Sequence, residues 1–403
     1  MADDHGTLRA IAWQQVFPSL RLFSALRMAL NFKALVLAAI AVAGMVAGWR
    51  ILGNLFADSD NPSLAAQIAF FDTWPWEVRV ASAPLERLVS LETWPSESPL
   101  LVAWNQTSAP FRQMYQAPSF ANFAYLLCCA LWSLLVWAFF GACITRLAAV
   151  SFARRENASL GQLAAFVSPR LSAYFVAPLF PILGTFLMAL FMAALGALMR
   201  TDVGVILASL AWPLVLLGSF VMAFLLLGLF FGFPLMWGSI SAEGTDSFGA
   251  LSHSYSYVYQ RPLLYLAYAV IAGIIGVLGS YLVSLFSLWI LELSRWGVSW
   301  GSGAARFSVI EGPESMGPIA DTGAAIIAFW TNCVHTLAFG FIFSYFWSAT
   351  TVIYFLLRRQ VDATELDEVY MPDEHDQHGL PPLKTGPDGM PAPVDDPEPL
   401  GAC

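Results

Sequence analysis

The chain has 403 residues, of which 58% are hydrophobic and only 12% are charged. Soluble domains carry about 25% charged residues, so a water-soluble fold of this length would lack the polar side chains to cover its surface. The net charge of -9 comes mainly from the carboxyl-terminal tail and does not indicate a nucleic-acid partner. The composition predicts an all-α polytopic membrane protein whose helices are solvated by the lipid bilayer.

The first segment, residues 1–33, places basic side chains among leucines and phenylalanines at helical spacing. This pattern predicts a basic amphipathic N-terminus on the cytoplasmic side. The apolar run that follows, Ala34 to Gly53, is about twenty residues long, which is enough to cross a bilayer. We therefore interpret it as a retained first transmembrane helix and not as a cleaved signal peptide.

Six apolar stretches predict six transmembrane helices, which make residues 34–357 one membrane domain. They lie at about 34–53, 119–145, 173–199, 207–237, 263–291 and 330–357. Lys and Arg residues gather near the ends that face one side, for example at Arg146 and Arg358. By the positive-inside rule, this bias predicts a multi-pass protein with both termini in the cytoplasm.

Two outer segments, 54–118 and 293–322, are rich in tryptophan. Indole rings favour the headgroup level of a membrane, so the longer segment is expected to form a small cap on the outer leaflet. The tail, residues 358–403, is rich in Pro, Asp and Glu and has too little apolar surface to fold. It is predicted to be a disordered cytoplasmic segment.

Prolines interrupt the third and fourth predicted spans, at Pro178, Pro181, Pro213 and Pro234. A single helix from Val203 to Trp237 would be ~50 Å long, whereas the hydrocarbon core of a bilayer is only ~30 Å thick. Proline lacks the backbone donor of a helix interior, so a kink or a short re-entrant piece is predicted before Pro213. Such breaks serve either to line a binding site or to pack helices.

Small residues recur at the spacing that lets membrane helices approach closely. The candidate packing positions are Gly44 and Gly48, Gly228 and Gly232, and the stripe of Gly273, Gly276 and Gly279.

One polar patch, made of Thr331, Asn332 and His335, lies in the last predicted span. The three residues share a helical face, and ionisable groups within a span are candidates for function. The alternatives are a solute-binding site and hydrogen bonding between helices.

Two cytoplasmic segments of similar pattern, 159–170 and 247–262, are each a Ser-led amphipathic stretch closed by a proline and an arginine. They predict two interfacial helices, which represent either a parallel internal repeat or generic interfacial helices without duplication. Segment 247–260 carries alternating tyrosines, which suit either lipid headgroups or a protein partner.

The stretches Asp246–Val258, Gln260–Pro262 and Leu356–Tyr370 resemble an uncharacterised group of multi-spanning membrane proteins of planctomycete bacteria. The resemblance implies a bacterial inner membrane and carries no known activity.

The sequence contains no zinc-protease motif, phosphate-binding loop or dinucleotide fingerprint. It therefore predicts no catalytic residues, no cofactor and no metal site, and the protein is not expected to be an enzyme. Our first functional hypothesis is a non-enzymatic scaffold or accessory subunit of a membrane complex. A protein partner would bind segment 247–260 or the acidic tail. The alternative is a channel or transporter for a small neutral solute.

Overall fold

The computed structural model describes residues 17–57, 61–74, 76, 99–114, 116–312 and 317–372. Within these ranges the regular structure is entirely helical, and one helical unit ends at Val369. Its elements are η1 (Pro18–Leu22), α2 (Phe23–Ala29), α3 (Phe32–Phe56), α4 (Pro62–Phe71), α6 (Pro99–Met114), α7 (Phe120–Ala153), α8 (Leu160–Val167), η2 (Ser168–Arg170), α9 (Leu171–Val176), α10 (Leu179–Leu198), α11 (Asp202–Leu210), α12 (Trp212–Glu243), α13 (Ser247–Gln260), α14 (Pro262–Ser302), α15 (Ala304–Glu311) and α16 (Pro318–Val361).

Six helical segments are long and apolar enough to cross a membrane. They are α3, α7, the run from Leu160 to Leu198, α12, α14 and α16. The predicted all-α polytopic membrane fold is thereby confirmed. Residues 1–16, residues 77–98 of the predicted cap, and the tail from 373 onward lie outside the described residues.

The last two spans are much longer than the sequence predicts. Helix α14 has 41 residues and α16 has 44, so each extends to ~60 Å or more, about twice the hydrocarbon thickness. The predicted end at residue 291 is too early because Glu292 does not interrupt α14. Glu292 lies one helical turn from Arg295 and pairs with it at 3.2 Å, so the charges are accommodated on the helix surface.

The expected break before Pro213 lies between α11 and α12. The Thr201 side chain caps α11 by accepting a hydrogen bond from the Gly204 backbone N–H at 3.1 Å. Pro213 occupies the first turn of α12, where its missing N–H has no helical partner to lose. The predicted span 207–237 is therefore split, and its apolar helix continues to Glu243.

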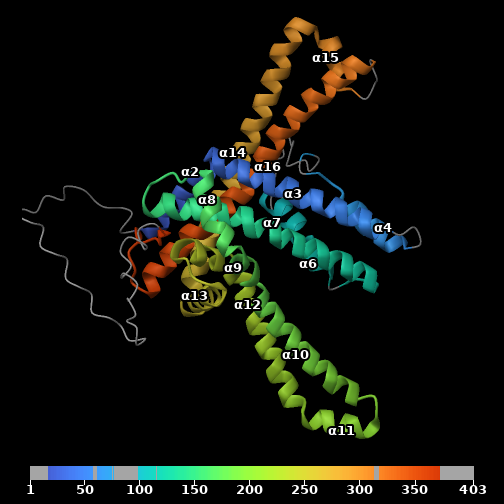
Figure 1. Cartoon of the computed structure of the whole chain (residues 1–403), viewed down its shortest axis with the longest axis vertical. Coiled ribbons are helices and arrows are strands. Elements are labelled where there is room, and N and C mark those ends of the chain that lie inside the picture. Colours follow the sequence, from blue (N-terminus) through green and yellow to red (C-terminus); the bar gives the residue numbers. More distant parts are fainter. Residues whose placement is uncertain are drawn as a thin grey trace, which may run out of the picture. The chain divides into compact units, whose positions relative to one another are not determined.

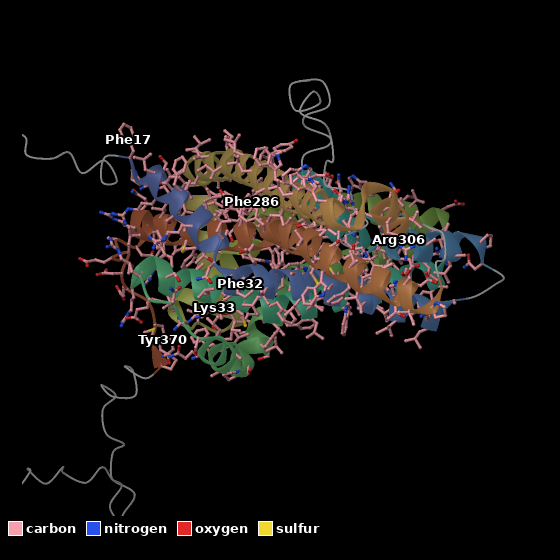
Figure 2. The ribbon with its side chains drawn as sticks, turned by 90° about the horizontal axis from the view of Figure 1, so that it is seen from above. Phe17, Phe32, Lys33, Phe286, Arg306 and Tyr370 are labelled. Carbon is pink, nitrogen blue, oxygen red and sulfur yellow. The ribbon has the colours of Figure 1, made fainter. Side chains whose placement is uncertain are left out.

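Figure 1 shows α10 and α12 side by side and joined by α11, and α14 and α16 joined by α15. Figure 2 shows Lys33, at the start of α3, and Arg306, on α15, at opposite ends of the long helices. We call the end with Lys33 the basic end, because Arg154 caps the end of α7, Arg261 caps the start of α14, and Arg358 lies in the last turn of α16.

Burial divides the long helices into two zones. Toward the basic end, α7, α12 and α16 bury continuous runs that include Gly141–Val150, Pro234–Ala242 and Phe339–Tyr345. Away from it, large apolar side chains are exposed, such as Phe186 on α10 and Phe220 on α12. This degree of apolar exposure is expected where lipid, and not water, surrounds a helix.

An aromatic core joins the three buried runs, and we define it as Trp137, Trp237, Phe343 and Trp347. The Trp237 and Trp347 rings stack at a centroid distance of 4.4 Å, and Trp137 stacks on Phe343 at 4.7 Å. Gly141 faces this core, since a methyl group there would lie 2.7 Å from the Trp237 ring. Close packing of this kind holds α7, α12 and α16 together at the basic end.

The candidate packing glycines differ in their surroundings. A methyl group at Gly48 would lie 1.7 Å from the Trp132 indole nitrogen, and one at Gly228 would lie 2.3 Å from the Tyr255 ring. One at Gly279 would lie 2.7 Å from Leu26, and one at Gly232 would lie 3.4 Å from Ser254. Gly44 and Gly273 face open space, and Gly276 is buried within α14.

Replacing Gly48 by alanine is expected to lower the free energy of unfolding by about 1 to 3 kcal/mol, as overpacking typically does. The Trp132 indole would have to move, and its hydrogen bond to the Gly44 carbonyl, 3.1 Å long, would be lost. Gly44→Ala is the matched control, because nothing lies within 4 Å of the added methyl group. Thermal unfolding in lipid nanodiscs measures both variants, and equal melting temperatures would contradict the assigned packing.

Candidate functional site at the end of α12

The last turns of α12 carry alternating polar residues, Ser239, Ser241 and Glu243, directly after the apolar span. Gly244 ends the helix in a left-handed conformation with φ +68°, which glycine adopts without strain. Asp246 then caps α13 by accepting a hydrogen bond from the Gly249 N–H at 2.8 Å. The chain thus reverses within three residues and brings α13 back along α12.

The Glu243 carboxylate is the centre of this site. One oxygen, Oε1, accepts from the Tyr354 hydroxyl at 2.5 Å and from Arg358 Nε at 3.0 Å. The other, Oε2, lies 2.9 Å from His253 Nδ1. We call Glu243, His253, Tyr354 and Arg358 the carboxylate cluster; it joins α12 to α13 and to α16.

The polar residues around the cluster extend the network into the loop after α16. Arg358 Nη1 donates to the Glu368 carbonyl at 2.9 Å, and the Tyr257 hydroxyl donates to the Asp362 carboxylate. Ser239 Oγ lies 3.2 Å from Thr245 Oγ1, so the turn after α12 is held as well. The side chain of Arg358 is only 9% exposed, so its charge is largely compensated by protein groups.

Two titratable side chains of α13, His253 and Tyr257, belong to this network, and the pKa of each is raised for a different reason. The hydrogen bond to the Glu243 carboxylate raises the pKa of His253 above its ordinary value. Burial raises the pKa of Tyr257, with a further contribution from its hydrogen bond to Asp362. Both shifts favour the protonated side chain, which is the form that donates to an acid.

A second group of polar side chains meets at Ser241. The Ser241 hydroxyl lies 2.6 Å from Thr145 Oγ1 and 2.8 Å from the Tyr174 hydroxyl. Arg146 Nη1 donates to the Ser241 carbonyl at 2.7 Å, and its guanidinium lies 3.8 Å from the Phe166 ring centre. This serine node, Ser241 with Thr145, Arg146 and Tyr174, joins α12 to α7 and α9.

The side chains around Glu243 come from two other helices, so the cluster joins helices. Three protein side chains contact the Glu243 carboxylate, so its lone pairs are engaged by groups that connect helices. No group of three or more His, Cys, Asp or Glu residues that could hold a metal ion occurs in the described part of the chain. Cys128, Cys129, Cys143 and Cys333 are free thiols.

The polar patch expected from the sequence lies elsewhere, on the exposed half of α16. Thr331, Asn332 and His335 are each partly exposed, and within the described ranges no hydrogen bond joins their side chains to another helix. Three of the prolines expected to interrupt the spans, Pro178, Pro181 and Pro213, lie at helix starts, whereas Pro234 lies inside α12, which continues past it to Glu243. Pro178 precedes α10, Pro181 is buried in its first turn, and Pro234 is buried beside the aromatic core.

Glu243 and Tyr354 are site residues that the sequence pattern does not predict, and Arg146 and Arg358 are predicted from it only as orientation signals. One signal was available. Glu243 is an acid at the end of an apolar span, and Arg358 is a cation at the equivalent end of another. Such a pair predicts an ion pair between helices only if the two spans are adjacent, and adjacency is not readable from one sequence.

Comparison with known proteins identifies no relative. The chain matches no protein-family model, no curated protein and no solved structure. The membrane architecture and the two polar groups at the end of α12 are therefore the features that bear on function.

Proposed function

We propose that the protein is a non-enzymatic scaffold or accessory subunit of a membrane complex. The observation that carries the proposal is the engagement of Glu243 and Ser241 by side chains from α7, α9, α13 and α16. A catalytic or substrate-binding carboxylate has to present free lone pairs to a ligand, whereas protein donors engage three of the about four acceptor sites of this one. Polar groups used in this way make a rigid unit at the basic end.

The helices that leave this rigid unit offer surfaces for neighbouring proteins. Few side chains of α10 and of the first half of α12 are buried. Phe186 on α10 and Phe220 on α12 are exposed. Apolar faces in a bilayer bind either lipid or another membrane helix, and small residues beside large ones favour the latter. We propose α10 and α12 as the partner-binding helices within the membrane.

The proposed orientation places the basic end, and both termini, in the cytoplasm of a bacterial inner membrane. The arginines of the basic end support it, because Lys and Arg are enriched in cytoplasmic segments. Segment 247–260 and the acidic tail then face the cytoplasm, where a basic protein partner would reach the tail.

Solute transport remains a prediction of the sequence and is not our proposal. Within the described residues no hydrogen bond joins the side chains of Thr331, Asn332 and His335 to another helix, although the charge of Arg295 on α14 acts on His335. A pathway for even a neutral solute requires polar groups from more than one helix facing a common space.

Photo-crosslinking in native membranes tests the scaffold proposal. A photoreactive residue at Phe186 or Phe220 is expected to give one protein adduct of discrete mass, because these exposed side chains face the proposed partner. Tyr174 is the control position, since it is fully buried and should react only within the chain. Phe220→Ala should then reduce the same complex, while Phe286→Ala on α14 should not. Adducts with lipid alone at both positions, together with a monomeric mass in nanodiscs, would refute the proposal.

A further inference from the structure

We propose that His253 is a proton-operated latch that holds α13 against the end of α12, and that losing its proton loosens α13 while α12 and α16 stay joined. The inference does not depend on the scaffold proposal, since it concerns the carboxylate cluster alone.

The donors to Glu243 come from two helices with different chemistry. Tyr354 and Arg358 both belong to α16, and Arg358 keeps its charge throughout the physiological pH range. His253 is the one donor from α13, and its ring titrates near neutral pH. The joint between α12 and α16 is therefore independent of pH, whereas the joint between α12 and α13 is not.

The proton concerned sits on His253. The imidazolium donates Nδ1–H to Glu243 Oε2 across 2.9 Å, in a charge-assisted hydrogen bond. Its side chain is 39% exposed, so water can accept the proton when the pH rises. The neutral ring then loses its charge, and in the tautomer with hydrogen on Nε2 it also turns a lone pair toward the carboxylate.

The charged and titratable groups that face His253 come from the helices packed against α13. Glu243 on α12 and Asp362 at the end of α16 favour the imidazolium, while Arg358 opposes it. Tyr257 stacks on the ring at 6.2 Å, and Tyr354 donates to the same carboxylate. Helix α9 and residues 262–291 of α14, which also contact α13 or adjoin it, carry no Asp, Glu, Lys, Arg or His.

The balance of these charges determines whether α13 is held more firmly at low pH or at high pH. The pKa of His253 is raised in the folded protein, with the Glu243 hydrogen bond as the largest contribution. The attachment is therefore complete below the ordinary pKa of histidine and is lost as the pH rises through the raised value. The latch is closed in acid and opens toward alkaline pH.

Opening would uncover a defined surface. The Tyr255 ring of α13 lies against Gly228, and Ser254 lies against Gly232, so α13 covers this glycine pair on α12. The Tyr255 and Tyr259 hydroxyls donate to α12 carbonyls at 2.6 Å and keep α13 tethered when His253 is neutral. The expected change is therefore local loosening of α13 and not its complete release.

Hydrogen exchange measured by mass spectrometry tests the latch on the full chain in nanodiscs. Between pH 5.5 and 8.5, after correction for intrinsic exchange, the protection of amides 247–260 is expected to fall about tenfold for each unit by which the His253 pKa is raised. Amides 350–358 of α16 should show no such change, because their carboxylate contacts do not titrate in this range. Protection of 247–260 that is constant with pH would overturn the proposal.

Three variants separate the latch from a general effect of pH. His253→Gln removes the charge and should give low protection of α13 at every pH, whereas His253→Arg keeps a permanent charge and should give high protection throughout. His335→Gln, on the exposed half of α16, should retain the wild-type pH dependence. A wild-type pH dependence in His253→Gln would refute the assignment even if all three variants fold.

Discussion

Replacing Glu243 by alanine is expected to lower the free energy of unfolding by about 3 kcal/mol, because it leaves the buried Arg358 guanidinium without its main counter-charge. The Tyr354 hydroxyl, 2.5 Å from Glu243 in the wild type, also loses its acceptor. Thermal unfolding in nanodiscs, followed by a thiol-reactive dye, measures the loss, since Cys129 and Cys143 are buried and become reactive only on unfolding.

Two further variants show whether the loss comes from the uncompensated charge. Glu292→Ala removes a carboxylate that pairs with Arg295 on the surface of α14, and stability should change by no more than about 0.5 kcal/mol. Glu243→Leu combined with Arg358→Met removes both charges and should recover part of the stability lost in Glu243→Ala. A double variant less stable than Glu243→Ala would show that the carboxylate contributes through other contacts.

Replacing Trp237 by alanine is expected to cost about 4 kcal/mol of unfolding free energy, within the range for removing a fully buried tryptophan. The substitution removes a ring stacked on Trp347 and a hydrogen bond from the indole nitrogen to the Tyr174 carbonyl at 2.9 Å. It thereby leaves a cavity where α7, α12 and α16 meet. The same thiol-reactivity assay measures this loss of stability. We expect Cys143 on α7 to react at a lower temperature in the variant than in the wild type.

Trp237→Phe and Trp289→Ala are the controls for this prediction. Phenylalanine keeps a stacked ring but cannot donate to Tyr174, so we expect a loss of about 1 kcal/mol from the hydrogen bond together with a smaller packing defect. Trp289 on α14 is 61% exposed, and its removal should leave Cys143 protected. If Trp237→Ala and Trp289→Ala were equally stable, the aromatic core would not hold the three helices together.

The positions of helix breaks were partly predictable because they depend on local chemistry. Proline is unfavourable within a helix interior, and α12 starts at Trp212, just before Pro213; Pro234 nevertheless lies inside α12 without ending it. The far ends of α14 and α16 were not predictable in the same way. We expected the fifth helix to end at residue 291, just before Glu292. A charged residue on an exposed helix surface does not end a helix, however, and α14 continues to Ser302.

The two glycines Gly44 and Gly48 show what spacing alone leaves open. Their sequence pattern is symmetric, yet only Gly48 faces the Trp132 ring, while Gly44 supplies a carbonyl to it. Which face of a helix meets a neighbour depends on the packing of the whole bundle. In the same way, His335 was the more prominent histidine in the sequence, but His253 is the one that the fold brings to an acid.

The sequence by itself determined that this is a multi-pass α-helical membrane protein, because apolar length and internal backbone hydrogen bonding are properties of each segment alone. Only the tertiary structure decided that Glu243, His253, Tyr354 and Arg358 meet, since their contacts join residues as far as 115 positions apart (243 to 358). In lipid, apolar helices attract one another weakly and without direction, so polar contacts and close ring packing select the neighbours. That selection depends on three-dimensional adjacency, which no single segment encodes.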